Sequence, residues 1–308
     1  MDKIKSPITN SFNTRLIKVY PKNDFINLYK ESINFDVTRF FLDTKDIFYV
    51  KCLDTGYKFF YPYSITGDDI FYEDLQQFDW YYPREKWEFN EALKQINNND
   101  KVLEIGAGNG AFLKKLDNNK DNINAIEFNK KSIAILKGQG YKVYNQTVQE
   151  LSQVKENYYD VVVSFQVLEH ISEVKSFIEA SLKVLKKGGK LIFSVPNNGA
   201  LIMKLDLNLS LNYPPHHMGH WDKKTFYNLQ EYFPIKCIDF THEPLQKKQY
   251  PRYYRIIALF LRRKFGIIGK GIDKFVLYPY SEYFIRRFSK NLKGLSLVVT
   301  FIKENEKN

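Results

Sequence analysis

A short apolar segment that ends in a glycine-rich turn limits the folds that this sequence can adopt. Residues 101–106 read KVLEIG and predict a buried strand, and GNGAFLKKL (108–116) predicts a helix directly after it. Glycine at 106, 108 and 110 lets the backbone turn sharply and approach a ligand closely. A helix N-terminus adds unpaired N–H groups. The turn alone does not choose a cofactor, because GAGNGA also fits the dinucleotide pattern G-x-G-x-x-G/A.

Strands and helices continue to alternate after this turn. Such alternation indicates a parallel, doubly wound sheet with right-handed crossovers. The segment YDVVVSF is nearly all apolar, as expected of a strand that is buried on both faces. The later strands are expected over 123–128, 141–145, 159–165, 190–197, 235–240 and 295–302, and the helices over 129–140 and 172–189.

The N-terminal region is rich in aromatic residues. It predicts two short strands joined by a turn, followed by two helices. These lie over 47–52, 57–62, 69–75 and 83–96. We divide the chain into an N-terminal extension or lid (1–90), a cofactor-binding core (91–240), a basic helical insertion that is an acceptor lid or a binding surface (241–294), and the last core strand with a tail (295–308).

The net charge of +11 belongs to one segment. Residues 247–293 carry thirteen Lys and Arg residues but only two acidic ones, so the rest of the chain is neutral. One interpretation is a helical lid whose basic face is solvated. The other is a surface for an anionic membrane or for a phosphate- or lipid-linked acceptor. Nucleic acid is a third possible partner, and we rank it below these two.

The composition predicts an intracellular, soluble protein. The first residues, MDKIKSPITNSF, contain no apolar run, so no signal peptide is expected. The apolar run IIALFL (256–261) is far shorter than the roughly 20 residues that cross a bilayer. The two cysteines are expected to be reduced thiols. We therefore expect a cytoplasmic protein, with peripheral contact at the inner face of the membrane if the basic segment binds lipid.

Two carboxylates favour a nucleoside that carries an amino-acid group. Glu104 lies two residues before the first glycine, where it would repel a pyrophosphate but accept hydrogen bonds from a cationic amino group. Glu127 ends the second strand, where a carboxylate can accept hydrogen bonds from both ribose hydroxyls.

Four motifs in order carry a resemblance to a known family. They are EIGAGNG, IEF, YDVVVSFQVLEH and LKKGGKLIFSVPN, and they span about residues 100–240. The chain resembles the class I S-adenosylmethionine-dependent methyltransferases, and specifically the branch with ubiquinone-biosynthesis O-methyltransferases and bacterial sugar and polysaccharide methyltransferases. The resemblance implies an α/β, Rossmann-like sheet of seven strands in the order 3-2-1-4-5-7-6, with the last strand antiparallel.

The resemblance also implies S-adenosylmethionine as cofactor and assigns residues to it. The backbone of the glycine turn would contact the methionine part, Glu104 its amino group, and Glu127 the ribose. Val148 and Gln149 are the expected adenine contacts. Phe128 covers the adenine or belongs to the core, and Gln166 is expected to face the cofactor. The complete set is Glu104, Gly106, Ala107, Gly108, Gly110, Glu127, Phe128, Val148, Gln149, Phe165 and Gln166.

A histidine-rich loop, YPPHHMGHW (213–221), follows the fifth strand at the carboxyl edge of the sheet, where ligands bind. No nearby carboxylate or cysteine completes a metal site, and H-H-x-x-H lacks the glutamate of H-E-x-x-H, so no metal is predicted. His217 or His216 is the expected general base, and His170 is a third candidate. A purely structural loop, and a packing role for His170, remain alternatives.

The sequence thus predicts O-methylation of a sugar or other small polar metabolite, in polysaccharide or secondary biosynthesis. An RNA methyltransferase is the main alternative, suggested by the charge, although no N-P-P-Y-type motif follows the fourth strand. A non-catalytic binding module is a third alternative, and the intact glycine turn and Glu127 argue against it.

Overall fold

A computed structural model describes residues 4–75, 77–78, 86–116, 120–205, 209–272, 283, 287 and 292–305. Its main sheet has seven strands in the order β10-β11-β8-β7-β4-β5-β6. Numbered along the chain, this is 3-2-1-4-5-7-6, and β11 is antiparallel to both neighbours, so the predicted topology is confirmed. The strands are β4 (Val102–Ile105), β5 (Ile123–Ile126), β6 (Lys142–Tyr144), β7 (Tyr159–Phe165), β8 (Leu185–Pro196), β10 (Ile235–Pro244) and β11 (Lys293–Lys303).

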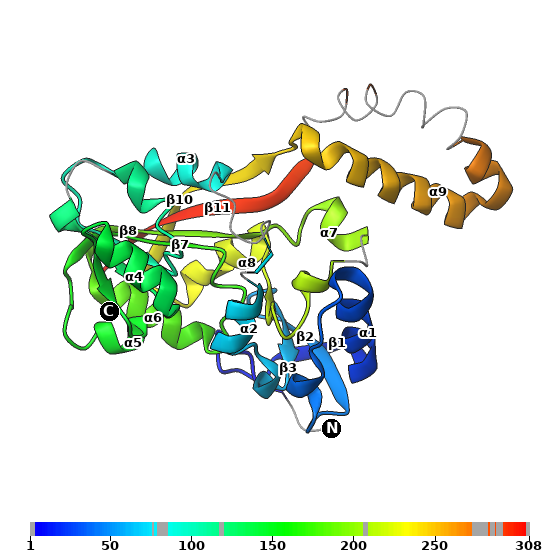
Figure 1. The fold of residues 1–308 in the computed structure, drawn as a ribbon, viewed down its shortest axis with the longest axis horizontal. Coiled ribbons are helices and arrows are strands. Elements are labelled where there is room, and N and C mark those ends of the chain that lie inside the picture. The colour runs from blue at the N-terminus through cyan, green and yellow to red at the C-terminus, as the bar shows by residue number, and fades with distance from the viewer. Residues whose placement is uncertain are drawn as a thin grey trace.

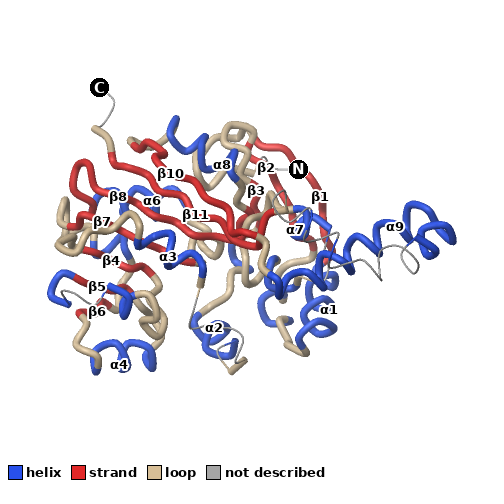
Figure 2. Tube along the Cα trace, turned by 90° about the horizontal axis from the view of Figure 1, so that it is seen from above, coloured by secondary structure: helices blue, strands red, loops and turns tan. Residues whose placement is uncertain are grey.

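The sheet is covered on both faces, which explains its apolar central strands. Every residue of β4 and β5 is buried. Helix α3 (Trp87–Leu93) packs on one face, against Val161 and Val163 of β7. Helix α6 (Val174–Val184) packs on the other face, against Val162. Figure 2 shows α4 (Lys130–Gly138) beside the β6 edge and α8 (Lys223–Asn228) near the β10 edge. The short helix α5 (Val148–Leu151) packs beside α6.

The segment after the glycine turn differs from the prediction. The helix expected over 108–116 is only a 3₁₀ helix, Leu113–Leu116. Gly110 has a φ of +76°, a left-handed conformation that a right-handed helix cannot include, so helical structure begins after it. The helix expected over 172–189 ends at Val184 because Leu185 already has extended backbone angles and starts β8.

A second, four-stranded sheet has the order β1-β2-β3-β9. The predicted strands appear as β2 (Asp46–Cys52) and β3 (Lys58–Tyr61), and the first predicted helix as α2 (Asp69–Leu75). Strand β1 (Thr14–Pro21) and helix α1 (Lys22–Ile33) were not predicted from the sequence. The fourth strand, β9 (Gly219–His220), comes from the histidine-rich loop and pairs with β3. The N-terminal sheet and this loop are therefore one structural unit, visible below the main sheet in Figure 1.

Helix α9 (Tyr250–Ile272) leads away from the main sheet and includes a break at Gly266. Its first turns pack on the body beside α7 (Leu201–Leu205), through Tyr253 and Ile256. Further along, apolar side chains are exposed, and Ile267 is 88% exposed. Most of the predicted basic segment beyond 272 lies outside the described residues. Among the described helices, none is both long and apolar enough to cross a membrane.

Candidate functional site

The glycine turn follows β4 and is hydrogen-bonded to the end of β5. The N–H groups of Gly106 and Ala107 both donate to the Ile126 carbonyl, at 2.9 and 3.2 Å. Gly106 has a φ of +77°, and a Cβ atom added to it would lie 2.5 Å from a methyl group of Val167. The position therefore requires glycine both for its backbone angles and for the close approach of the segment after β7.

Glu127 holds this turn in place. One carboxylate oxygen accepts a hydrogen bond from the Gly108 N–H at 2.7 Å. The other accepts from the N–H groups of Phe128 and Asn129, at 2.9 and 2.8 Å. The carboxylate thus joins the loops that follow β4 and β5. Its contact with the ribose stays a prediction.

Glu104 is buried in the middle of β4, and its Oε2 atom has no hydrogen-bond partner in the part of the chain that the structure describes. Burial raises the pKa of its carboxyl well above the usual range, and the charge of Lys86 opposes this shift. A buried carboxyl oxygen without a donor is costly. A cationic amino group would supply the missing donor, so Glu104 fits the amino group of S-adenosylmethionine.

The other predicted cofactor residues have mixed environments. Gln166 has a φ of +57°, and its side chain donates to Ser194 at 3.1 Å and Glu88 at 3.4 Å. Phe165 is buried in an aromatic cluster beneath α3. Phe128, in contrast, is 46% exposed.

The two expected adenine contacts lie at the start of α5. Val148 is buried in the main core. The Gln149 side chain donates to Ser176 at 3.1 Å. The contacts of these two residues with the cofactor stay predictions, as does that of Gly110, which packs against Leu136 of α4.

The three candidate bases come together in the structure. The ring centroids of His170, His216 and His217 lie 4.5 to 4.9 Å apart. His170 follows β7, and the other two belong to the histidine-rich loop, which the pairing of β9 with β3 holds in place. The Glu169 carboxylate lies beside them, with an oxygen 3.9 Å from His217 Nε2. We call these four side chains the histidine cluster.

Hydrogen bonds fix the tautomers of the histidine cluster. Nδ1 of His170 lies 2.6 Å from the His216 carbonyl, and Nδ1 of His216 lies 2.9 Å from the Leu211 carbonyl. Because a carbonyl oxygen only accepts, both Nδ1 atoms carry hydrogen. Nδ1 of His217 lies 3.3 Å from Asn212 Oδ1, which also accepts from the Asn198 amide. Each ring thus has Nε2 as its acceptor nitrogen.

His220 has a different role from its two neighbours. Its Nε2 lies 2.7 Å from the Asn212 carbonyl and its Nδ1 lies 2.7 Å from the Tyr49 hydroxyl. With both ring nitrogens in hydrogen bonds between the loop and β2, His220 anchors the loop. The sequence groups His216, His217 and His220, whereas the structure replaces His220 with His170.

Burial dominates the electrostatics of the histidine cluster. It lowers the pKa of His170 to about 4, and it lowers those of His216 and His217 well below the usual range. It raises the pKa of Glu169 to about 8. The segment after β7 links the histidine cluster to the glycine turn, because Val167 lies against Gly106 and precedes Glu169 by two positions. The charge of Lys86 lowers the pKa of both Glu104 and Glu169, against the effect of burial. The sequence contained no signal for this role of Lys86.

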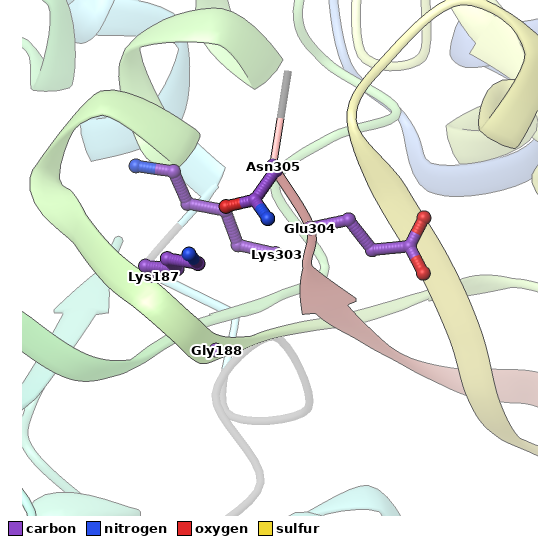
Figure 3. A pocket seen from close by; sticks show the side chains of 5 residues that line it. All are labelled: Lys187, Gly188, Lys303, Glu304 and Asn305. Atoms are coloured by element: carbon purple, nitrogen blue, oxygen red, sulfur yellow. The ribbon is translucent and has the colours of Figure 1, made fainter. Parts of the chain in front are cut away.

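A surface hollow elsewhere takes no part in this arrangement. Figure 3 shows it between the Lys187–Gly188 bend at the start of β8 and the residues that end and follow β11, Lys303–Asn305. Lys190 of β8 pairs with Ile302 of β11, so the hollow lies at the amino edge of the parallel strands. The glycine turn and the histidine cluster follow the carboxyl ends of β4 and β7, at the opposite edge.

The strand order, the glycine turn and the two buried carboxylates define a class I S-adenosylmethionine-dependent methyltransferase. Residues 78–233, half of the chain, match the family described as "Methyltransferase domain". The chain belongs to this methyltransferase family. Its fold is also that of a SAM-dependent methyltransferase from Archaeoglobus fulgidus, at 17% identity and a TM-score of 0.50, over 75% of this chain and all of that one.

Curated relatives match a shorter stretch. The ubiquinone biosynthesis O-methyltransferase of Cronobacter sakazakii is 27% identical over 106 residues, which cover 32% of this chain and 44% of that protein. The enzyme of the same name from Acinetobacter baumannii is 30% identical over 104 residues, again 32% and 44% of the two chains. The chain thus spans less than half the length of the curated relatives it matches.

Proposed function

We propose that the protein transfers the methyl group of S-adenosylmethionine to a hydroxyl group of a sugar or another small polar metabolite. The observation that carries this proposal is the histidine cluster, whose Glu169 and His170 closely follow Val167, the residue that lies against the glycine turn. The sulfonium of S-adenosylmethionine supplies an activated methyl group. The protein then has to align the acceptor, exclude water and remove the proton of the attacking hydroxyl.

The cluster is suited to proton removal. Because burial lowers the pKa of His216 and His217, both rings are neutral near pH 7 and present an unprotonated nitrogen to the acceptor hydroxyl. Their Nδ1 atoms are directed to fixed acceptors, so a proton would be accepted at Nε2. The names of the curated relatives, which are O-methyltransferases, support a hydroxyl acceptor over an amine. The sugar rests on the resemblance of the loop 213–221 to one in polysaccharide-linked methyltransferases.

Release of S-adenosylhomocysteine in the presence of candidate acceptors tests the proposal. The panel contains nucleotide sugars, a catechol, a lipid-linked sugar and transfer RNA, and mass spectrometry identifies the methylated product. We expect turnover with a sugar hydroxyl. Turnover only with transfer RNA would establish the RNA alternative. Micromolar binding of S-adenosylmethionine without turnover on any acceptor would favour a binding module.

Variants assign the base. His217→Ala should lower the methyl-transfer rate by about 10²–10⁴-fold and leave cofactor affinity unchanged, the usual range for loss of a general base. His242→Ala, on β10 and outside the cluster, is the matched control and should keep the wild-type rate. A rate loss below tenfold for His217→Ala would move the role to His216 or His170.

We also propose that α9 contacts an anionic membrane or a lipid-linked acceptor. In the described part of α9, Phe260, Phe265 and Ile268 are at least 46% exposed, next to Arg262 and Arg263. Exposed aromatic and aliphatic side chains interleaved with cations are typical of helices that lie in the membrane interface. A helical lid with a solvated basic face is the alternative to membrane contact, and co-sedimentation with lipid vesicles distinguishes the two.

A further inference from the structure

The histidine cluster has three properties that proton removal alone does not require. They are the mutual distance of its nitrogens, the partners of its Nδ1 atoms, and the state of the Glu169 carboxylate.

The first property is convergence. The imidazoles of His170, His216 and His217 each offer one nitrogen, and these three atoms all lie within 4.8 Å of one another. Nitrogen ligands about 2.0–2.1 Å from one ion lie roughly 3.5 Å apart in a tetrahedral site, so small side-chain rotations would close the set. The rings come from two segments that are 46 positions apart in the chain, and the N–H groups of Met218 and Gly219 join these segments by donating to the Glu169 carbonyl.

The second property is the orientation of the rings. Histidines that bind a metal usually donate their other N–H to a carbonyl or carboxylate oxygen, which fixes the ring and makes the ligating nitrogen more basic. All three rings have this arrangement, through the carbonyls of His216 and Leu211 and the Asn212 side chain. Asn212 is itself fixed by Asn198, at 3.0 Å.

The third property is an unsatisfied carboxylate. Glu169 is completely buried, and among the described residues neither of its carboxylate oxygens has a hydrogen-bond partner. Such a group calls for an explanation, and an ion is one. Its Oε1 atom lies 3.9 Å from His217 Nε2, on the side of the three imidazoles. A cation among the rings would satisfy the carboxylate that the protein leaves without a donor.

We propose that the histidine cluster binds a divalent transition metal ion, with Nε2 of His170, His216 and His217 and the carboxylate of Glu169 as ligands. Three imidazoles and one carboxylate favour Zn²⁺, Fe²⁺, Co²⁺ or Ni²⁺ over Mg²⁺ or Ca²⁺, which prefer sets of oxygen ligands. The His220 ring, although adjacent, is excluded because both of its nitrogens are in other hydrogen bonds.

A metal ion at this site would also have a role in the proposed methyl transfer. This role rests on the proposed function, whereas the metal site itself does not. An ion that takes the acceptor hydroxyl as a further ligand lowers the pKa of that hydroxyl and orients it. Because the imidazole nitrogens would then hold the ion, the hydroxyl would release its proton to solvent rather than to a histidine. Its oxygen would form the new bond to the methyl carbon as the bond from that carbon to the sulfonium breaks, and S-adenosylhomocysteine would leave. This favours acceptors with two neighbouring hydroxyl groups, which can both bind one ion.

Cobalt binding without any acceptor tests the site. The full chain, without a polyhistidine tag and after treatment with a chelator, is titrated with Co²⁺, and the visible absorption bands of protein-bound Co²⁺ are recorded. Metal content of untreated protein is measured by mass spectrometry. We expect one equivalent of Co²⁺ per chain, displacement of the bands by Zn²⁺, and a higher melting temperature with Zn²⁺.

Three variants decide whether the cluster is the site. His217→Ala and Glu169→Gln should weaken Co²⁺ binding by about 10²-fold or more, since each removes one of four ligands. His242→Ala should bind like the wild type. Circular dichroism checks folding, and Glu169→Gln, which keeps the shape of the side chain, serves if His217→Ala fails to fold.

Two results would overturn the site. One is the absence of stoichiometric Co²⁺ and Zn²⁺ binding by the wild type. The other is binding that survives in folded Glu169→Gln and His217→Ala. These readouts involve no acceptor, so inactivity on every acceptor would count against the proposed function only. Full activity after chelator treatment would show that a general base, and not a metal ion, acts on the acceptor hydroxyl.

Discussion

The unpartnered oxygen of Glu104 permits a prediction with two opposite effects. Replacing Glu104 with Gln keeps the size of the side chain but removes the charge that would attract the cofactor's amino group. Loss of a hydrogen bond between two charged groups costs about 1.5–3 kcal/mol, so the affinity for S-adenosylmethionine should fall about 10- to 150-fold. The same substitution removes a buried carboxyl whose Oε2 atom receives no hydrogen bond from any described residue.

The second effect concerns stability and has a definite pH dependence. Burial raises the pKa of folded Glu104 above its unfolded value of about 4.3. The folded protein therefore binds this proton more tightly, and the group destabilises the fold increasingly as the pH rises between the two values. The Glu104→Gln variant lacks this loss. Its melting temperature, relative to that of the wild type, should rise from pH 4.5 to pH 7.5.

Calorimetry with two ligands measures the first effect. S-adenosylhomocysteine contains the amino-acid group, whereas methylthioadenosine lacks it but keeps the nucleoside. The variant should lose affinity for the first ligand and bind the second like the wild type. Equal losses for both ligands, or no loss for either, would refute the contact between Glu104 and the amino group.

Three further predictions concern the turn, the ribose and the membrane. Glu127→Gln should weaken the binding of methylthioadenosine as well as that of S-adenosylhomocysteine. It should also lower the melting temperature, because Glu127 accepts three backbone hydrogen bonds. Unchanged affinities for both ligands would exclude the ribose contact. Gly106→Val should abolish cofactor binding, since its Cβ would lie 2.5 Å from a methyl group of Val167 at a positive φ; normal binding would show that this is not the cofactor turn. Replacing Arg262 and Arg263 with Glu should reduce co-sedimentation with anionic vesicles at low salt, where each cation contributes about 1 kcal/mol. Equal, negligible binding of the wild type to anionic and neutral vesicles would exclude membrane binding and favour the solvated lid.

The sequence predicted the main sheet well because its signals are local. Each strand of the core is a short apolar run between breaks, and β7 has the residue range that was predicted for it. The order of the strands came from the resemblance, and the structure confirms it. The prediction of a helix over 108–116 was wrong, because the left-handed backbone at Gly110 delays the start of helical structure.

The histidine cluster could be predicted only in part, because it depends on contacts across the chain. Each of its histidines was a candidate, but nothing in the sequence shows that His170 and Glu169 meet the loop 213–221. The metal argument from sequence looked for a carboxylate close to the loop, whereas the structure brings it from the segment after β7. Lys86 and Asn212 carry no motif, so their roles follow from the folded geometry alone.

The pairing of β9 with β3 limits which segments of this protein can be exchanged with those of its relatives. The strands β1 to β3 precede residue 78, where the family match begins, yet the fourth strand of their sheet lies deep inside the matched region. A crossover placed between these parts would give a chimera whose acceptor loop lacks its partner strand. Residues 46–61 and 213–221 should therefore be exchanged only together, and related proteins with different acceptors should differ in both segments at once.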